Sequence, residues 1–391
     1  MRVGIYYNNP PPKAGGAYTL LNTIINDINS SEVEHDFYIF YNDSSAPKKY
    51  QENNIVYINC YKKNKKPNLI LRIIRKFFNF SFKKSNDDYL NNIFNNENID
   101  LLWILGPYYI NTAIPFVFTV WDLGHRMLPC FPEVSRGNEW KYREKMYKEM
   151  LPKATYIIAG NKTGKNEIIA NFPVNPEKIH IMPLPIPSFC FNDSIQIVNP
   201  SFQVNFPFIF YPAQFWAHKN HIILIETIAW LRDEKKIIIN CYFTGYDHGN
   251  LEYVNKKIKK YNLENQIFII GFISQDELIY LYKNALAMVF PSFLGPNNLP
   301  PLEAMALGCP LLYSDITGHI EQMEGAGLPI NATNASNIGE AIIKIFQDSK
   351  FREDLILNGL KFTNKNKSYS YFNEMKKIIN SFYKYYKTWK E

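Results

Sequence analysis

The segment from Ala287 to Pro310 constrains the fold of this chain more than any other stretch. Its first four residues form an apolar run that ends at a proline, which predicts a buried strand of a parallel sheet. A loop of Gly, Pro and Asn follows, and Leu-Pro-Pro-Leu-Glu-Ala-Met-Ala then reads as the start of a helix. A strand, a polar loop and a helix start together present backbone N–H groups to an anion. Glu303, in the first turn of that helix, either accepts hydrogen bonds from sugar hydroxyls beside a phosphate or only complements the helix dipole.

The same alternation of apolar runs and amphipathic stretches continues through both halves of the chain. A stretch with little periodicity and prolines at 183, 185, 187, 200 and 207 separates the halves and predicts a linker. A chain of 391 residues is too long for one typical core. We therefore predict an α/β fold of two doubly wound domains that face each other across a cleft. Their expected bounds are 1–190 and 208–370, with a linker at 191–207 and a C-terminal helix at 371–391.

Short apolar runs bounded by glycine, proline or polar residues predict the strands. The predicted strands are Met1–Tyr7, Asp36–Asn42, Ile55–Asn59, Leu101–Leu105, Phe116–Val120, Ala154–Gly160, Phe208–Tyr211, Ile237–Thr244, Ile267–Ile273, Ala287–Phe290 and Pro310–Ser314. Helical spacing of apolar residues predicts the helices. The predicted helices are Tyr18–Ile28, Glu139–Met150, Thr163–Ala170, Ile222–Arg232, Ala335–Gln347, Lys350–Gly359 and Tyr371–Trp389.

The composition indicates a globular protein of a reducing compartment. Hydrophobic residues make up 46% of the chain and charged residues 20%, which is enough to bury a core. The cysteine number is odd and the spacing fits neither a metal site nor a CxxC motif, so we expect free thiols. The five cysteines are Cys60, Cys130, Cys190, Cys241 and Cys309. No apolar run approaches the roughly 20 residues of a membrane span, and the N-terminus lacks the layout of a signal peptide. The expected location is the cytoplasm.

One basic segment, from Tyr61 to Ser85, differs from the rest of the chain. Its nine Lys and Arg residues stand without an acid and account for the whole net charge of +7. On a helix, one stripe would be apolar and another basic, which is typical of a helix lying on an anionic membrane. The alternative is a solvated helix that packs its apolar stripe on its own domain. Contact of Lys62–Lys84 with the inner face of the cytoplasmic membrane is thus one expectation, and no recognised nucleic-acid module accompanies the segment.

Three short motifs resemble the donor-binding signature of one enzyme family. They are Leu299–Ala306 (LPPLEAMA), Gly308–Pro310 and Tyr313–Asp315. This pattern is similar to that of the retaining nucleotide-sugar glycosyltransferases of glycosyltransferase family 4 (glycosyl transferases group 1), which have the GT-B fold. The resemblance is strongest over Phe208–Gly327. It implies two Rossmann-like domains, the first binding an acceptor and the second a nucleotide sugar, with a C-terminal helix that crosses back to the first domain.

The resemblance also implies roles for residues of the second half. Glu303 would hold the ribose of the nucleotide and Lys219 its diphosphate, while Gln214 stands where the family has an arginine. The backbone at the helix start would bind the phosphate nearest the sugar, and Phe272 and Ile273 would contact the base. The residues of that helix start are Leu299, Pro300 and Leu302.

One departure from the family concerns the transferred sugar. The family has a glutamate eight residues before Glu303, and this chain has Gly295 there. Asn297 and Asn298 are the nearby polar side chains that would replace it.

The acceptor side is predicted in the first half. Gly15 and Gly16 lie between a strand and a helix, where glycine lets the backbone approach a ligand, although such a pair can also be an ordinary loop feature. Asp122 follows an apolar strand, at the sheet edge where open α/β folds bind ligands. The family's cleft histidine is replaced by Trp121, which leaves His125 either as a cleft residue with a catalytic role or as a structural histidine.

Together these features predict a retaining hexosyltransferase that uses a UDP- or GDP-sugar and a glycan or lipid-linked acceptor. Glu303, Lys219 and His125 are the predicted catalytic residues. Lys219 and backbone amides would stabilise the leaving diphosphate, so neither a metal nor another cofactor is expected. The family's commonest role suggests synthesis of a bacterial surface polysaccharide (O-antigen, capsule or lipopolysaccharide). Two alternatives stay open: a GT-B phosphorylase or epimerase, and a catalytically silent binding partner of an active transferase.

Overall fold

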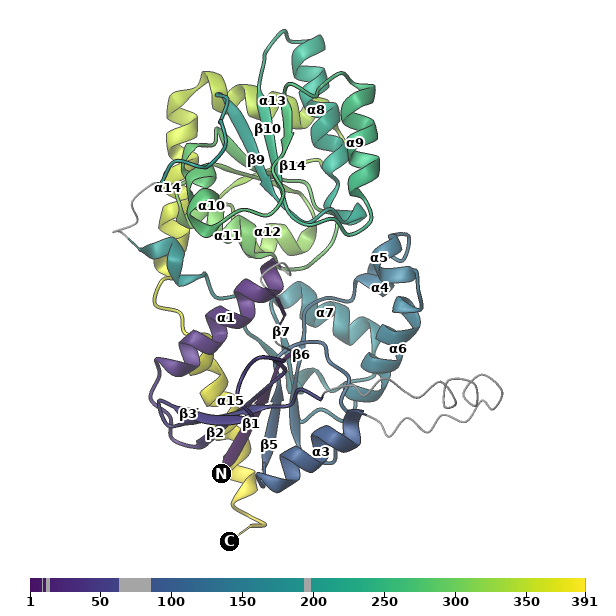
Figure 1. Ribbon diagram of the computed structural model, residues 1–391, viewed down its shortest axis with the longest axis vertical. Coiled ribbons are helices and arrows are strands. Elements are labelled where there is room, and N and C mark those ends of the chain that lie inside the picture. The colour runs from purple at the N-terminus through teal and green to yellow at the C-terminus, as the bar shows by residue number, and fades with distance from the viewer. Residues whose placement is uncertain (9, 12–14, 63–85, 193–197, 391) are drawn as a thin grey trace.

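The chain folds into two α/β domains, each built around one sheet, as the ribbon of the computed structural model shows (Figure 1). The structure describes residues 1–8, 10–11, 15–62, 86–192 and 198–390. Apart from Lys62, the basic segment Lys62–Lys84 lies outside the described residues, and its predicted membrane contact stays a prediction. Within the described ranges, no helix is both long and apolar enough to cross a bilayer.

The first domain contains an eight-stranded sheet in the order β3-β4-β2-β1-β5-β6-β7-β8. All neighbouring strands are parallel except β3, which pairs with β4 in the antiparallel direction. The strands are β1 (Arg2–Tyr6), β2 (Asp36–Tyr41), β3 (Lys49–Glu52), β4 (Ile55–Asn59), β5 (Leu101–Ile104), β6 (Phe116–Val120), β7 (Tyr156–Ala159) and β8 (Ile179–Ile181). Helices cover both faces of this sheet, which explains why its central strands are apolar throughout rather than alternating.

The second domain contains six parallel strands in the order β11-β10-β9-β12-β13-β14. They are β9 (Phe208–Pro212), β10 (Asn240–Thr244), β11 (Ile267–Ile269), β12 (Ala287–Phe290), β13 (Leu311–Ser314) and β14 (Leu328–Ile330). Two of these six strands are shorter than predicted by three residues or more. β10 begins only at Asn240 because Ile238, at 55% exposure, lies outside the core. β11 ends before Gly271, whose φ of 69° is incompatible with an extended strand.

The helices connect these strands and mostly follow the predicted ranges. They are α1 (Gly16–Asn29), α3 (Asn86–Asn96), α4 (Gly124–Met127), α5 (Pro132–Ser135), α6 (Glu139–Met150), α7 (Lys162–Asn171), α8 (His221–Asp233), α9 (Leu251–Lys260), α10 (Gln275–Asn284), α11 (Leu299–Ala306), α12 (Thr317–Met323), α13 (Ala335–Gln347), α14 (Ser349–Lys365) and α15 (Tyr371–Tyr386). Residues 317–323, for which no helix was predicted, form α12. Gly318 is required there because a Cβ would lie 2.7 Å from the backbone of Pro296.

The last helix, α15, packs on the first domain, as predicted (Figure 1). The carboxylate of Asp27, in α1, accepts hydrogen bonds from Ser370 Oγ (3.0 Å) and from the backbone N–H of Phe372 (2.9 Å). The ring of Phe372 meets that of Phe37 edge to face at 5.2 Å. The C-terminal helix therefore belongs to the core of the first domain.

Direct hydrogen bonds join the two domains beside the cleft. The carboxylate of Glu321, in α12, accepts from the backbone N–H groups of Lys162 (2.6 Å) and Thr163 (2.7 Å) at the start of α7. Asn161 Nδ2 donates to the carbonyl of Pro296 (2.7 Å). A carboxylate at a helix N-terminus complements the helix dipole. These contacts hold the carboxyl ends of the two sheets face to face.

Candidate active site between the two domains

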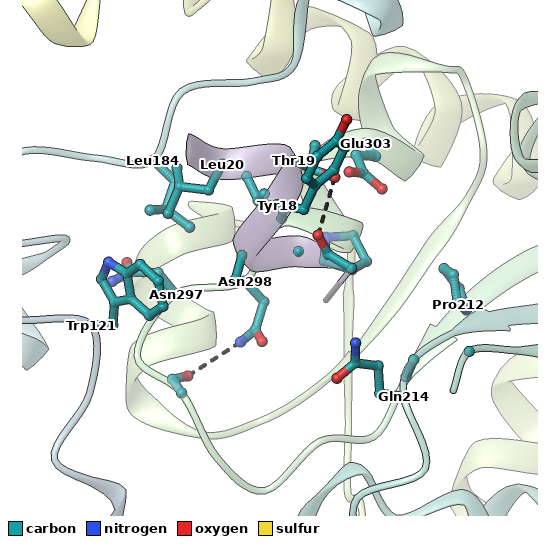
Figure 2. Close-up of a pocket in the computed structure, with 18 of the residues that line it drawn as sticks. Tyr18, Thr19, Leu20, Trp121, Leu184, Pro212, Gln214, Asn297, Asn298 and Glu303 are labelled. Atoms are coloured by element: carbon teal, nitrogen blue, oxygen red, sulfur yellow. Dashed lines mark hydrogen bonds between the residues drawn. The ribbon is translucent and has the colours of Figure 1, made fainter. Parts of the chain in front are cut away.

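A cavity of about 570 Å³ lies between the domains and is lined by residues of both, as expected for a small-molecule site. Every predicted site residue lines it except His125 and Leu302. Those that line it are Gly15, Gly16, Asp122, Gln214, Lys219, Phe272, Ile273, Gly295, Asn297, Asn298, Leu299, Pro300 and Glu303. Figure 2 shows Tyr18 and Thr19 of α1 together with Gln214, Asn298 and Glu303 of the second domain around this cavity. The Leu302 side chain instead packs in the core.

The glycine loop of the first domain closely approaches the second domain. Gly15 precedes α1 with φ 60° and ψ −124°, a conformation that strongly favours glycine. A Cβ on Gly15 would lie 3.1 Å from Nε2 of Gln214 across the cleft, whereas one on Gly16 would meet nothing within 4 Å. The N-terminus of α1 thus opens on the cavity, where the N–H groups of a first helical turn can bind an anion.

Lys219 extends into the cavity from a short 3-10 turn before α8. Its Nζ donates to Asn298 Oδ1 (3.1 Å) and lies 5.0 Å from the centre of the Phe290 ring. Burial lowers the pKa of Lys219 to about 8, although the nearby carboxylates of Asp122 and Glu133 oppose that shift. No carboxylate of the described residues forms an ion pair with this ammonium. A desolvated ammonium without an ion-pair partner is well suited to bind an anion.

A chain of hydrogen bonds fixes the orientation of the Asn298 amide. Asn298 Nδ2 donates to His319 Nε2 (2.9 Å), and His319 Nδ1 donates to Ser314 Oγ (2.7 Å). Ser314 Oγ in turn donates to the carbonyl of Ser292 (2.6 Å). Burial lowers the pKa of His319 to about 3, so the ring is neutral and Nε2 can accept. Asn298 Oδ1 is therefore directed toward Lys219.

Glu303 is the fifth of the eight residues of α11, just past the first turn in which it was predicted, and is 6% exposed. The hydroxyl of Tyr282 donates to its Oε2 (2.9 Å). Burial raises the pKa of Glu303 to about 7, and the hydrogen bond from Tyr282 opposes the shift. In the described part of the chain, no group donates to Oε1. This oxygen is available to a ligand hydroxyl.

The loop before α11 fits tightly between the two domains. An added Cβ on Gly160, in the first domain, would lie 2.1 Å from Nδ2 of Asn297. Gly295 has φ 99° and lines the cavity, where the resemblance implies a glutamate. The small residue at Gly160 therefore lets a second-domain loop enter between the strand ends of the first domain.

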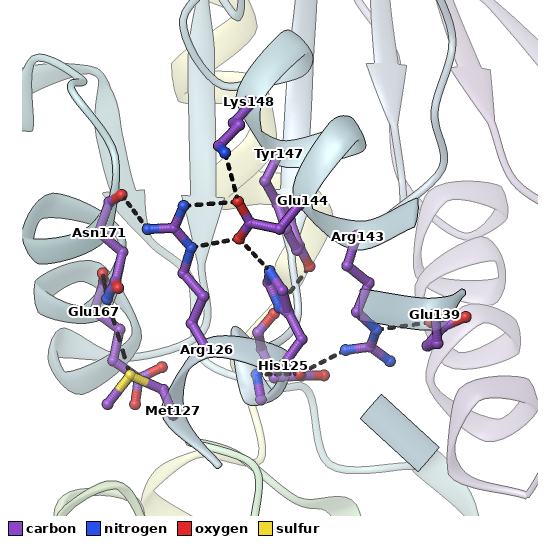
Figure 3. A network of polar contacts seen from close by, with 12 residues as sticks. His125, Arg126, Met127, Glu139, Arg143, Glu144, Tyr147, Lys148, Glu167 and Asn171 are labelled. Carbon is purple, nitrogen blue, oxygen red and sulfur yellow. Dashed lines mark hydrogen bonds and ion pairs between the residues drawn. The ribbon is translucent and has the colours of Figure 1, made fainter. Parts of the chain in front are cut away.

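The structure corrects the predicted position of His125. Asp122 lines the cavity and its Oδ1 accepts from Arg143 Nη1 (2.9 Å), but α4 turns His125 away from the cleft (Figure 3). The His125 ring is fully buried, and its Nε2 donates to Glu144 Oε1 (3.1 Å). Burial and the positive charge of Arg143 lower the pKa of His125. A buried neutral imidazole in this place is a structural group.

The contacts of Glu144 anchor the loop that follows β6. Arg126 Nη2 donates to Glu144 Oε2 (2.9 Å), and Lys148 Nζ lies 3.0 Å from the same oxygen (Figure 3). The hydrogen bond from Arg126 lowers the pKa of Glu144 to about 2. This ion-pair group holds residues 121–127 in place and thereby positions Asp122.

Several lining residues were not predicted. Glu133 (α5) and His218 come from opposite domains and are hydrogen-bonded to each other. The sequence contained one signal for this pair, the position of His218 beside Lys219.

Tyr246 and Phe272 form an exposed aromatic surface at the rim, with ring centres 5.2 Å apart. Phe272 was predicted as a base contact, but Tyr246 was not. Tyr246 follows the end of β10 and Phe272 the end of β11, so predicting that they meet required the strand order.

Two facing domains with parallel sheets and a cavity between their carboxyl edges define the GT-B fold. A sucrose-phosphate synthase from Thermosynechococcus elongatus has the same arrangement, with a TM-score of 0.72, 15% sequence identity, and 98% of this chain and 99% of that chain covered. Residues 195–362 match the family described as glycosyl transferases group 1.

Two curated relatives extend the comparison in sequence. The O-antigen chain mannosyltransferase B of Escherichia coli is 26% identical over 237 residues, covering 59% of this chain and 61% of the relative. The O-antigen chain mannosyltransferase RfbU of Salmonella typhimurium is 25% identical over 203 residues, covering 52% of this chain and 54% of the relative. The match thus spans little more than half of the length of these relatives.

Proposed function

We propose that this protein is a retaining hexosyltransferase that moves a sugar from a nucleotide diphosphate donor to a glycan or lipid-linked acceptor in bacterial surface-polysaccharide synthesis. The observation that supports this most is the placement of Lys219 and Glu303 in one interdomain cavity. Because the two curated relatives are named mannosyltransferases of the O-antigen chain, mannose is the first sugar to test, carried on GDP or UDP.

Each group then has a separate task. The Lys219 ammonium and the N–H groups of Leu299 and Leu302 at the start of α11, where Pro300 and Pro301 have none, stabilise the diphosphate, which gains charge as its bond to the anomeric carbon breaks. The free Oε1 of Glu303 accepts a ribose hydroxyl. The aromatic surface of Tyr246 and Phe272 offers a stacking face to the base. The acceptor oxygen forms the new bond on the face that the diphosphate leaves, and its proton departs with the diphosphate.

The cavity residues offer no cluster for a metal. Among the described residues, no group of three or more His, Cys, Asp or Glu side chains is arranged to hold an ion. We propose that the cationic side chain and the helix amides act in place of a metal.

A ligand screen tests the proposal. UDP-, GDP-, ADP- and TDP-sugars are compared by thermal shift on the wild type and on the Lys219→Ala and Glu303→Ala variants, since a ligand of the native state raises Tm. One nucleotide is expected to stabilise the wild type and neither variant. Release of that nucleotide only with acceptor present, and an NMR spectrum showing the donor's anomeric configuration in the product, would establish transfer with retention. A wild type that none of the four nucleotides stabilises would refute the proposal.

A further inference from the structure

A carboxylate and a histidine from opposite domains meet at the wall of the cavity. Glu133 Oε1, in α5 (Pro132–Ser135), accepts a hydrogen bond from the backbone N–H of His218 (2.8 Å) and a second from His218 Nδ1. Both side chains are largely buried, with 6% of Glu133 and 11% of His218 exposed. Both line the cavity, and His218 directly precedes Lys219. The pair exists only while the two domains are together.

The protons of this pair can be assigned. Burial opposes ionisation of Glu133, but the hydrogen bonds from His218 outweigh it and lower the pKa of the carboxyl. Because a carboxylate can only accept, His218 Nδ1 carries the ring proton. Burial also lowers the pKa of His218, and the Lys219 ammonium adds to that shift, while Glu133 and Asp122 oppose it. The ring is neutral, and its lone pair is on Nε2.

This lone pair is available in the cavity. No described residue donates to His218 Nε2, and the atom is not sealed off from solvent. Phe131 meets the imidazole edge to face at 6.1 Å and stacks on Phe293 at 6.0 Å, so these two rings support the imidazole, although neither lines the cavity. An anion would be repelled by the lone pair and by the carboxylate of Glu133 behind it. The ligand group that fits a single neutral acceptor at the wall of the cavity is a hydroxyl on a carbon skeleton, as in a carbohydrate.

We propose that His218 binds a carbohydrate hydroxyl in this cavity, which donates a hydrogen bond to Nε2, and that Glu133 is the positioning residue that sets the tautomer. This inference rests on the proposed function. The hydroxyl belongs either to the transferred hexose or to the acceptor. The imidazole belongs to the second domain and is oriented by a carboxylate of the first. It then supplies a polar contact in the cavity that Gly295, which has no side chain, also lines.

The substitution His218→Asn separates this role from a purely structural one. The asparagine amide can occupy the place of Nδ1 and still donate to Glu133, but it has no atom where Nε2 reaches the cavity. We expect an unchanged Tm, unchanged affinity for the nucleoside diphosphate alone, and a loss of at least about tenfold in kcat/KM for transfer. His180→Asn is the matched control, because His180 lies in β8 and does not line the cavity.

Two measurements identify the source of the hydroxyl. If it belongs to the donor hexose, His218→Asn weakens binding of the nucleotide sugar while binding of the nucleoside diphosphate stays the same. If it belongs to the acceptor, donor binding is unchanged and the KM for the acceptor rises. Glu133→Gln, which keeps an accepting oxygen but no charge, is expected to lose less activity than His218→Asn.

Two results would overturn the inference. Transfer by His218→Asn at the wild-type rate would mean that Nε2 contacts no substrate. An equal loss of affinity for the nucleoside diphosphate and the nucleotide sugar would assign His218 only to the placement of Lys219. A wild type that binds no nucleotide at all would instead refute the proposed function, so the two failures are distinguishable.

Discussion

The charged groups on the two sides of the cleft differ in the direction of their pKa shifts: on one side the neutral forms are favoured, on the other the ionised forms. On the second-domain wall, burial shifts the pKa of Glu303 up to about 7 and that of Lys219 down to about 8, so both are pushed toward their neutral forms. Behind the first-domain wall, in the ion-pair group that anchors the loop after β6, the hydrogen bond from Arg126 lowers the pKa of Glu144 to about 2. The charged groups on this side are thus stabilised as ions by protein partners.

This difference indicates which side of the cleft binds a ligand and which side supports the structure. Groups that are buried without an ion-pair partner reduce the stability of the free protein and gain the most when a ligand supplies the missing partner. Groups that neutralise one another stabilise the fold and have little left to offer a ligand. The second-domain wall is therefore the side where the nucleotide is expected to bind, and the ion pairs around Glu144 hold the facing loop.

The largest effect is expected on stability, from the substitution of Glu144 behind the first-domain wall. Glu144→Gln removes the charge that Arg126 and Lys148 neutralise, and we expect a loss of about 3 kcal/mol of unfolding free energy at pH 7. Because the folded-state pKa of Glu144 is lowered, to about 2, this stabilisation is present above about pH 4.5 and disappears as the pH falls toward 2. Denaturant titrations of both proteins at pH 7 and pH 3 would check this, and an equal difference at both pH values would contradict it.

A substitution of Glu303, on the second-domain wall, is expected to change the unfolding free energy in the opposite direction. Because the folded-state pKa of Glu303 is raised, from 4.5 to about 7, its ionisation destabilises the free protein as the pH rises through that interval. Glu303→Gln, which can still accept from Tyr282, should therefore be more stable than the wild type by up to about 3 kcal/mol at pH 8 and equal to it at pH 4. The variant should also bind nucleotide more weakly. If Glu303→Gln were less stable than the wild type at pH 8, the contrast between the two sides of the cleft would be wrong.

Lys219 should make nucleotide binding depend on pH. Below pH 8 the ammonium is charged, and above it the affinity for a nucleoside diphosphate should fall by up to about tenfold per pH unit. At pH 7, Lys219→Ala should bind at least about tenfold more weakly, and its affinity should no longer decrease on the alkaline side. Isothermal titration calorimetry from pH 6.5 to 9.5 would measure both curves. A wild-type affinity that is flat across this range would argue against Lys219 as the phosphate ligand.

The smallest effect concerns the support of Lys219 itself. His319→Gln can place an amide oxygen near the former Nε2 and still accept from Asn298, whereas His319→Asn reaches only toward Ser314. We expect His319→Asn to bind nucleotide about fivefold more weakly and His319→Gln to bind like the wild type. Equal affinities of the two variants would show that the orientation of Asn298 does not affect Lys219.

The sequence predicted the central strands well because they are continuous apolar runs, which a sheet covered on both faces requires. The exposed edge strand β3 (KYQE) has no such run and was not predicted. The second-domain site was also largely predictable, since Leu299–Ala306 and Lys219 lie in short contiguous motifs. The failures have physical causes. His125 follows Asp122 by three residues, but α4 rotates its ring into the core. Glu133 contacts His218 only because the two domains pack together, and a local sequence pattern cannot predict such a contact.

The packing of α15 on the first domain gives the molecule an unusual connectivity. The carboxylate of Asp100 accepts from the backbone N–H of Arg2 (2.9 Å) and from Lys390 Nζ (2.6 Å), so one side chain ties together residues from the two ends of the described chain (Figure 1). In topological terms, the second domain is an insertion into the first, and the chain enters and leaves it by two separate crossings. A body attached at two points can turn about the line that joins them but cannot swivel freely. Opening of the cleft is thereby restricted to one hinge axis, which preserves the alignment of the two walls each time it closes.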